Sequence, residues 1–132
     1  MDLPAGLTGS AALTVTATDT AEALGSGDVP VLATPRVVAL VEAATVDAVR
    51  GRLPAGQTTV GVRVDLSHQA PSPIGAVVTA DARLLTVGGR SIRFAVTVTD
   101  QNGGLVAEAT VDRVAVDRIQ FLAGLPGVGP AE

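Results

Sequence analysis

Apolar and polar residues alternate along most of the second half of the chain. Four segments there have the two-residue period of a β-strand: 57–68, 75–87, 91–100 and 105–119. The turns at 88–90 and 101–104 are rich in glycine and predict antiparallel hairpins between the last three. An earlier segment, 12–18, alternates apolar residues with threonine and predicts a fifth strand.

Residues 33–51 have the spacing of an amphipathic helix instead. Thr34 suits the N-cap and Pro35 the first helical position, whereas Gly51 and Pro54 are expected to end the helix. The preceding segment, 19–33, contains Gly, Ser, Asp and Pro and predicts a surface loop with a short helical turn.

The order of elements is therefore strand, loop, helix and four antiparallel strands, which predicts an α+β protein. One helix and a long meander bury each other most simply when the sheet curls around the helix. A curled antiparallel sheet wrapped around one central helix is the hot-dog fold. Hot-dog proteins generally pair their sheets edge to edge, so we expect a homodimer, and further pairing into a tetramer stays open.

The length of 132 residues suits a single domain, residues 1–132, with an ordered core at 10–121. Residues 122–132 are rich in Gly and Pro and predict a flexible tail.

The composition excludes several kinds of site. The chain has no cysteine and one histidine, so thiolate and multi-histidine metal sites within one chain are excluded. Its nine basic residues are all arginine and dispersed, and Trp and Tyr are absent, which argues against nucleic-acid binding. No apolar run reaches the roughly 18–20 residues that span a bilayer, so no membrane segment is expected. The N-terminus has no secretory signal pattern, which predicts a cytoplasmic protein, and the lysine-free composition suggests a GC-rich bacterial genome.

Glu42 interrupts the apolar side of the predicted helix. At about 100° per residue it falls between Val46 and Val49, about 120° from the polar stripe of the helix. One interpretation is that its side chain reaches water from the edge of the buried face. The other is a carboxylate at a mostly apolar interface, which has to be paired, neutralised or functional because an unpaired buried charge costs several kcal/mol.

His68 and Thr34 are the candidate partners of this carboxylate. His68 shares its parity with Val60, Val62, Val64 and Leu66, so in a strand without a bulge it points towards the helix. A single histidine is more often structural than catalytic, and a threonine before a proline is an ordinary N-cap. The only histidine of the chain nevertheless points to the same layer as the displaced carboxylate.

These three residues resemble the Thr–Glu–His set of the fluoroacetyl-CoA thioesterase family of hot-dog enzymes. The likeness rests on Thr34, on Glu42 in "ALVEAA" and on His68 in "VDLSHQAPSPIG", at intervals of eight and 26 residues. "TTVGVRVDLSH" resembles the second strand of that family and "VDRVAVDRIQF" its last strand, so the resemblance covers about residues 10–121.

The resemblance implies an acyl-CoA thioesterase that hydrolyses a small or medium acyl-CoA, with no cofactor and no metal. Glu42 would be the nucleophile or general base, His68 would move protons, and Thr34 would orient these groups or the acyl group. Gly61 matches a position associated with the acyl end of the substrate, and Arg113 matches an arginine of the family, so both are expected to bind substrate.

The loop before the helix departs from the family pattern. The fluoroacetyl-CoA enzyme has phenylalanines there that act as a lid, whereas Gly25 and Asp28 stand at about those places in this chain. The departure implies a different or broader acyl-CoA substrate. Two other functions stay open: a hot-dog hydratase or dehydratase, which usually uses an Asp–His pair, and a non-catalytic acyl-CoA-binding protein.

The spacing of Thr34 and Glu42 predicts a site that involves two chains. Eight residues of helix rise about 12 Å, which is too far for direct contact. Three explanations are open: the helix starts after Thr34, the loop folds back, or one of the residues comes from the partner subunit. We expect the last, a site shared between chains or lined by both. Four arginines are candidates for the phosphates of coenzyme A: Arg90, Arg93, Arg113 and Arg118.

Overall fold

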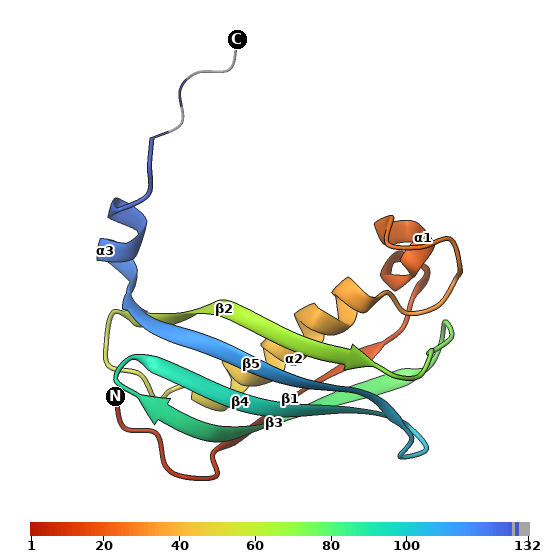
Figure 1. The fold of residues 1–132 in the computed structure, drawn as a ribbon, viewed down its shortest axis with the longest axis horizontal. Coiled ribbons are helices and arrows are strands. Elements are labelled where there is room, and N and C mark those ends of the chain that lie inside the picture. The colour runs from red at the N-terminus through yellow and green to blue at the C-terminus, as the bar shows by residue number, and fades with distance from the viewer. Residues whose placement is uncertain (128, 130–132) are drawn as a thin grey trace.

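A computed structural model describes residues 1–127 and residue 129 (Figure 1). Its elements are, in order, β1 (Thr8–Thr14), the 3-10 helix η1 (Ala17–Asp19), α1 (Ala21–Leu24), α2 (Thr34–Val49), β2 (Gln57–His68), β3 (Val77–Gly88), β4 (Ser91–Asp100), β5 (Leu105–Asp117) and α3 (Arg118–Ala123).

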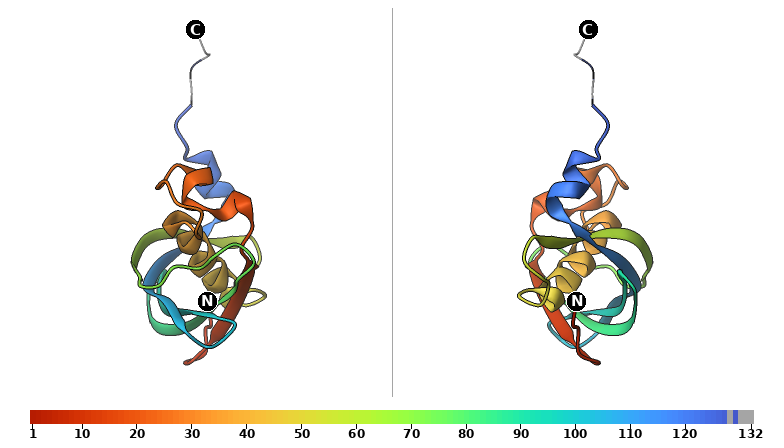
Figure 2. Two further views of the ribbon diagram at one scale, coloured as in Figure 1. Left: turned by 90° about the vertical axis from the view of Figure 1, so that its right-hand side faces the viewer. Right: turned by 90° about the vertical axis from the view of Figure 1, so that its left-hand side faces the viewer.

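The five strands form one antiparallel sheet in the order β1-β3-β4-β5-β2. Seen from either end, the sheet curls around α2, which lies along its concave side (Figure 2). The predicted hot-dog fold is therefore confirmed. Strands β1 and β2 are the two edges of the sheet, so each leaves one side of its backbone without a neighbouring strand among the described residues.

The core lies between α2 and the concave side of the sheet. Val37 and Val41 from the helix and Val78, Phe94 and Val111 from three strands are fully buried. The cluster consists largely of alanine and valine, so the two layers lie close together.

Glycine makes the closest approach of these layers possible. Gly9 of β1 lies over the last turns of α2, where a Cβ atom would meet the backbone of Ala48 and Ala44. Only a residue without a side chain fits between two backbones at this distance. At the same end of α2, Asp47 Oδ2 accepts a hydrogen bond of 2.9 Å from the Ser10 N–H, which ties the helix to β1 again.

The start of α2 differs from the prediction by one residue. Ala33, not Thr34, is the N-cap, and no side chain caps the helix. Thr34 is the first helical residue, and Pro35 follows it in the first turn. The prediction of Thr34 as a capping residue was wrong because its hydroxyl binds elsewhere. At the other end, Arg50 is the C-cap and Gly51 has a φ of 72°, which agrees with the predicted stop.

The first strand and the loop after it also differ from their predicted limits. The strand predicted at 12–18 runs from Thr8 to Thr14, and η1 begins three residues later, at Ala17. The loop at 19–33 contains the expected helical turn, α1, but it is not wholly at the surface. Leu32 and Ala33 are each 1% exposed.

A β-bulge in β2 interrupts the alternation that the sequence predicts for this strand. The register with β5 shifts between Gly61 and Arg63, so Val62 is an extra residue, and its exposed fraction is 60%. Val64 and Leu66 pack against the core as predicted, but Val60 and Val62 do not. His68 lies beyond the bulge and keeps the parity of Val64 and Leu66.

Strand β5 ends two residues earlier than predicted, at Asp117, because that residue caps α3. Its side chain accepts a hydrogen bond from the Gln120 N–H. Leu122 and Ala123, predicted as the start of a flexible tail, belong to α3. The tail prediction also covers residues 128 and 130–132, which lie outside the described residues.

Within the part of the chain that the structure describes, no helix is long and apolar enough to cross a membrane.

Candidate active site

Thr34 and His68 meet where α2 begins and β2 ends. Thr34 Oγ1 lies 2.8 Å from His68 Nδ1, within hydrogen-bond distance. Both elements bring these residues to the same end of the molecule, next to α1 (Figure 1). The threonine hydroxyl is thus directed at the only histidine of the chain rather than at the backbone of its own helix.

The surroundings of His68 favour a neutral imidazole. Burial lowers the pKa of His68 below its ordinary value of 6.5, and the nearby backbone of Ala70 opposes this shift. Nε2 is buried and has no hydrogen-bond partner among the described residues. A neutral imidazole with one ring nitrogen unpaired can accept a proton and then, as the imidazolium, donate it.

Glu42 lies further along α2 and forms an ion pair with Arg113 of β5. Arg113 Nη1 is 3.2 Å from Glu42 Oε2, and the exposed fractions of the two side chains are 7% and 36%. The same guanidinium donates to Thr59 Oγ1 at 2.9 Å and to the Thr59 carbonyl at 3.2 Å. Burial lowers the pKa of Arg113, and the charge of Glu42 opposes this shift. The carboxylate is therefore held in place by a buried cation, and it does not extend freely into water.

Gly61 lies directly opposite this carboxylate. A Cβ atom at Gly61 would overlap Glu42 Oε2 and would come within 3.2 Å of Arg113 Nη1. Glycine is needed here because the strand backbone passes so close to the ion pair. Val62, the bulged residue, follows immediately, so the backbone of β2 changes direction beside Glu42.

The five predicted site residues thus form two groups within one chain. One group is Thr34 with His68, and the other is Glu42 with Gly61 and Arg113. Between the groups, α2 advances about 12 Å over eight residues. Strand β2 advances about 23 Å from Gly61 to His68 at the usual rise per residue. No hydrogen bond or ion pair between described residues joins Glu42 to Thr34 or His68.

Thr59 is a site residue that the sequence did not reveal. A regular alternation through Val62 puts Thr59 on the face opposite to Leu66, away from the helix. The bulge reverses the parity of the residues before it, so Thr59 and Gly61 face the helix together. Gly61 was the only local signal of this irregularity, since glycine within a strand often marks a bulge.

A pocket of about 340 Å³ opens beside Thr34 and His68. Its other walls are α1, the loop after it and the turn after β2, contributed by Ala21, Ser26, Gly27, Asp28, Val29, Val31, Leu32, Gln69, Ala70 and Pro71. Within residues 1–127 and 129, no cluster of three or more His, Cys, Asp or Glu side chains has metal-binding geometry.

The arginines considered for coenzyme A lie in different surroundings. Arg113 is engaged with Glu42 and Thr59, and Arg93 forms a two-point ion pair with Asp112 at 2.7 and 3.1 Å. Arg90 and Arg118 are exposed.

Comparison with known protein families finds a match over most of the chain. The sequence profile of the family described as fluoroacetyl-CoA-specific thioesterase, FlK, matches residues 15–119. No curated protein matches the chain.

Solved structures agree with the family match. A point mutant of FlK is 26% identical, with 93% of this chain and 95% of that chain covered and a TM-score of 0.85. The same type of mutant in complex with fluoroacetate and CoA is 26% identical, with coverages of 90% and 99% and a TM-score of 0.83. A thioesterase superfamily member from Thermus thermophilus is 25% identical, with coverages of 92% and 90% and a TM-score of 0.85. The chain therefore belongs to the FlK family of hot-dog thioesterases and is a thioester hydrolase.

Proposed function

We propose that the protein hydrolyses small or medium acyl-CoA thioesters with Thr34, Glu42 and His68. The observation that carries this proposal is the hydroxyl of Thr34, which lies against the only imidazole and leaves its own helix without a side-chain cap. The crystal structure of an FlK mutant holds fluoroacetate and CoA, which supports a CoA thioester as substrate.

Hydrolysis breaks the carbon–sulfur bond of the thioester and forms a carbon–oxygen bond from water. Either Glu42 removes a proton from the attacking water, or it attacks the carbonyl carbon and water then cleaves the resulting anhydride. The proton taken from water passes to neutral His68 and from the imidazolium to the departing CoA thiolate. Backbone N–H groups at the start of α2 or beside Gly61 stabilise the negative charge on the carbonyl oxygen. Arg113 forms an ion pair with Glu42 and holds it over Gly61.

The complete site forms across a homodimer in this proposal. The exposed edge of β2 offers unpaired backbone groups to a second β2 strand. An antiparallel pair of these strands, with a two-fold axis near the middle of β2, would bring the His68 end of one strand close to Gly61 of the partner subunit. Glu42 of the partner subunit then faces the Thr34–His68 pair, which removes the separation seen within one chain.

The pocket beside His68 suits an acyl group of modest size. Its volume is about 340 Å³, near the lower end for small-molecule sites. The loop after α1 contributes Ser26, Gly27, Asp28 and Val29, none of which is aromatic. An open wall of this kind favours a broader range of acyl groups than fluoroacetyl alone.

Release of free CoA from a panel of acyl-CoA thioesters tests the function. Because the chain has no cysteine, a thiol reagent reads only the product. We expect Glu42→Gln and His68→Ala to lower kcat/KM by about 100- to 10,000-fold, the usual contribution of acid–base groups.

Glu108→Gln is the matched control, since Glu108 is an exposed glutamate of β5 outside both groups. It should hydrolyse the panel like the wild type. Equal rates in the wild type, Glu42→Gln and His68→Ala would remove these residues from the mechanism.

A further inference from the structure

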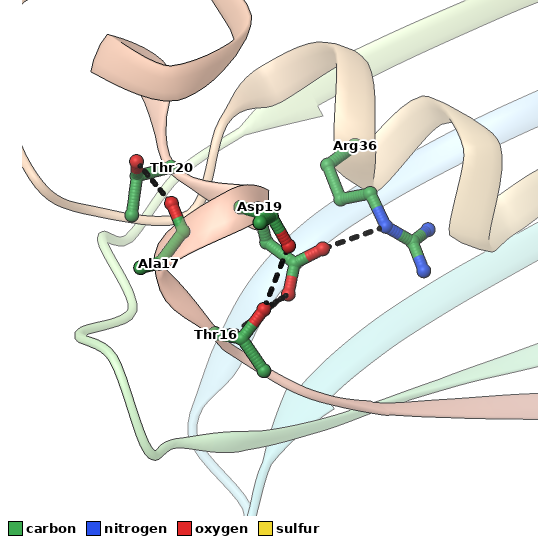
Figure 3. Close-up of polar contacts among 6 residues, drawn as sticks. Thr16, Ala17, Asp19, Thr20 and Arg36 are labelled. Carbon is green, nitrogen blue, oxygen red and sulfur yellow. Dashed lines mark hydrogen bonds and ion pairs between the residues drawn. The ribbon is translucent and has the colours of Figure 1, made fainter.

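Asp19 is a buried carboxylate that the proposed mechanism does not use. Its exposed fraction is 8%, and it lies in η1 beside the first turn of α2 (Figure 3). Its Oδ2 atom accepts hydrogen bonds from the N–H and hydroxyl of Thr16, at 2.8 and 2.9 Å. Its Oδ1 atom forms an ion pair with Arg36 Nε at 3.1 Å. One side chain therefore links the segment just after β1 to the start of α2.

The backbone of Asp19 holds the residue immediately before Thr34. The Ala33 N–H donates to the Asp19 carbonyl at 2.9 Å. One residue earlier, Leu32 bridges to Thr20 on the same side, and its N–H donates to the Ser72 carbonyl at 2.9 Å on the other side. The segment that leads into α2 is thus fixed on both sides, and Asp19 provides the contact nearest to Thr34.

Asp19 supplies a negative charge near the N-terminus of α2, where the first turn has none. No side chain caps α2, and its first turn contains no acidic residue but does contain Arg36. A positive charge at the N-terminus of a helix is unfavourable, and a negative charge is favourable. Hydrogen bonds from Thr16 and the charge of Arg36 lower the pKa of Asp19, against the effect of burial, so the group is ionised at neutral pH.

We infer that Asp19 is a positioning residue for Thr34. Asp19 anchors the start of α2 in place of an N-cap side chain, and the hydroxyl of Thr34 is therefore left to contact His68. An N-cap side chain normally accepts a hydrogen bond from the first helical turn. Here Asp19 fixes that turn from outside through Ala33 and Arg36. The effect on the Thr34–His68 pair is independent of catalysis, and only its consequence for turnover rests on the proposed function.

The only histidine of the chain provides a direct readout. In a long-range proton–nitrogen NMR spectrum of the tag-free protein, the two ring nitrogens of His68 report which of them carries the proton. In the wild type, the contact of Nδ1 with Thr34 should select one tautomer. Asp19→Ala should shift or broaden these signals in the same way as Thr34→Val, and Asp19→Asn should have a smaller effect in the same direction.

Asp47→Asn is the matched control. Asp47 also ties α2 to the N-terminal strand, through Ser10, and lies near an arginine of the same helix, Arg50, at 3.8 Å. It is at the opposite end of α2, so its loss should destabilise the fold without moving the His68 signals. If Asp19→Ala does not fold, Asp19→Asn and Arg36→Met decide the question by the same spectrum.

Wild-type His68 signals in folded variants at both Asp19 and Arg36 would overturn the inference. Altered signals support it, and kinetics then test the consequence. We expect kcat to fall about tenfold while KM changes little, because misplaced catalytic groups slow turnover more than they weaken binding. Altered signals with unchanged kcat would support the positioning role of Asp19 and would count against Thr34 in the proposed mechanism.

Discussion

At the scale of single residues, Thr34 shows how a local sequence rule is overridden. A threonine before a proline at a helix start predicts a capping hydroxyl. In the structure Ala33 occupies the N-cap position, and the hydroxyl contacts His68 instead. The anchoring of the helix passes to Asp19, which is remote from the cap in sequence and adjacent in space.

A capping role and a catalytic role of Thr34 predict different effects when its hydroxyl is removed. Loss of a cap lowers the stability of the fold, whereas loss of a catalytic contact lowers the rate of hydrolysis. Thr34→Val removes the hydroxyl and keeps the shape, so we expect the free energy of unfolding to change by less than the roughly 1 kcal/mol that a lost N-cap costs. We expect kcat to fall about 100-fold, because the orientation of His68 is lost. Urea denaturation and CoA release measure the two quantities.

Thr34→Ser serves as the control because it retains the hydroxyl, and it should keep most of the activity. A large loss of stability in Thr34→Val with an unchanged kcat would restore the capping role and contradict the catalytic one.

The sequence was sufficient to select the candidate residues but not all of their contacts. The isolated carboxylate Glu42 and the single His68 both stand out from an apolar pattern. The ion pair between Glu42 and Arg113 joins residues 71 positions apart, so no local pattern reveals it. Asp19 also escaped notice, because one acidic residue in a polar loop is ordinary until its burial is known.

At the scale of elements, the bulge in β2 decides which side chains reach the site. It turns Thr59 and Gly61 towards α2 while Val64, Leu66 and His68 keep the same side. Without it, Val60 and Val62 would share the side of Leu66, and Thr59 and Gly61 would point away from the helix. One extra residue therefore joins the Glu42 group and the His68 group on a single surface.

Gly61→Ala tests how closely β2 passes Glu42. The new Cβ atom would overlap Glu42 Oε2, so the carboxylate has to leave its place or the strand has to move. We expect kcat to fall about 100-fold, since a displacement of about 1 Å is sufficient for such a loss. Steady-state kinetics with the best acyl-CoA substrate measure the change.

Gly88→Ala is the matched control in the same sheet. Its Cβ atom would meet nothing within 4 Å, and its backbone is not in the left-handed region. Equal activity of both glycine variants would show that the space beside Glu42 does not matter for the reaction.

The elements were predictable to different degrees for physical reasons. Strand β4 agrees with its predicted range, because a glycine turn bounds it on each side and its alternation is uninterrupted. The limits of β1 were wrong, because threonine-rich residues 15–18 continue the alternating pattern after pairing with β3 has ended. A bulge leaves alternation in the sequence unchanged, so the pattern of apolar residues did not predict the orientation of Val62, and Gly61 was the only sign of it.

At the scale of the whole molecule, the proposed site depends on the partner subunit. Mixed dimers of two inactive variants test this. If the site combines Glu42 of one chain with Thr34 and His68 of the other, a Glu42→Gln/His68→Ala hybrid has one intact site. Random exchange of subunits should then restore about a quarter of the wild-type activity, since half of the dimers are hybrids in a two-fold assembly. CoA release before and after exchange measures the recovery.

A second mixture controls for indirect effects of exchange. His68→Ala and Thr34→Val alter the same half-site, so their hybrids should stay inactive. Absence of recovery in the first mixture, with hybrids verified by mass spectrometry, would contradict a site shared between subunits.

The close approach of β1 to α2 at Gly9 also limits how the protein can move. Two backbones in contact leave the helix no space to slide along the sheet, and the Asp47–Ser10 hydrogen bond holds it further. The helix is thus a rigid support, and widening the pocket for entry of an acyl chain or release of its acid falls to the loop after α1. Substitutions in that loop should therefore alter the rates of substrate entry and product release while the reacting groups stay in place.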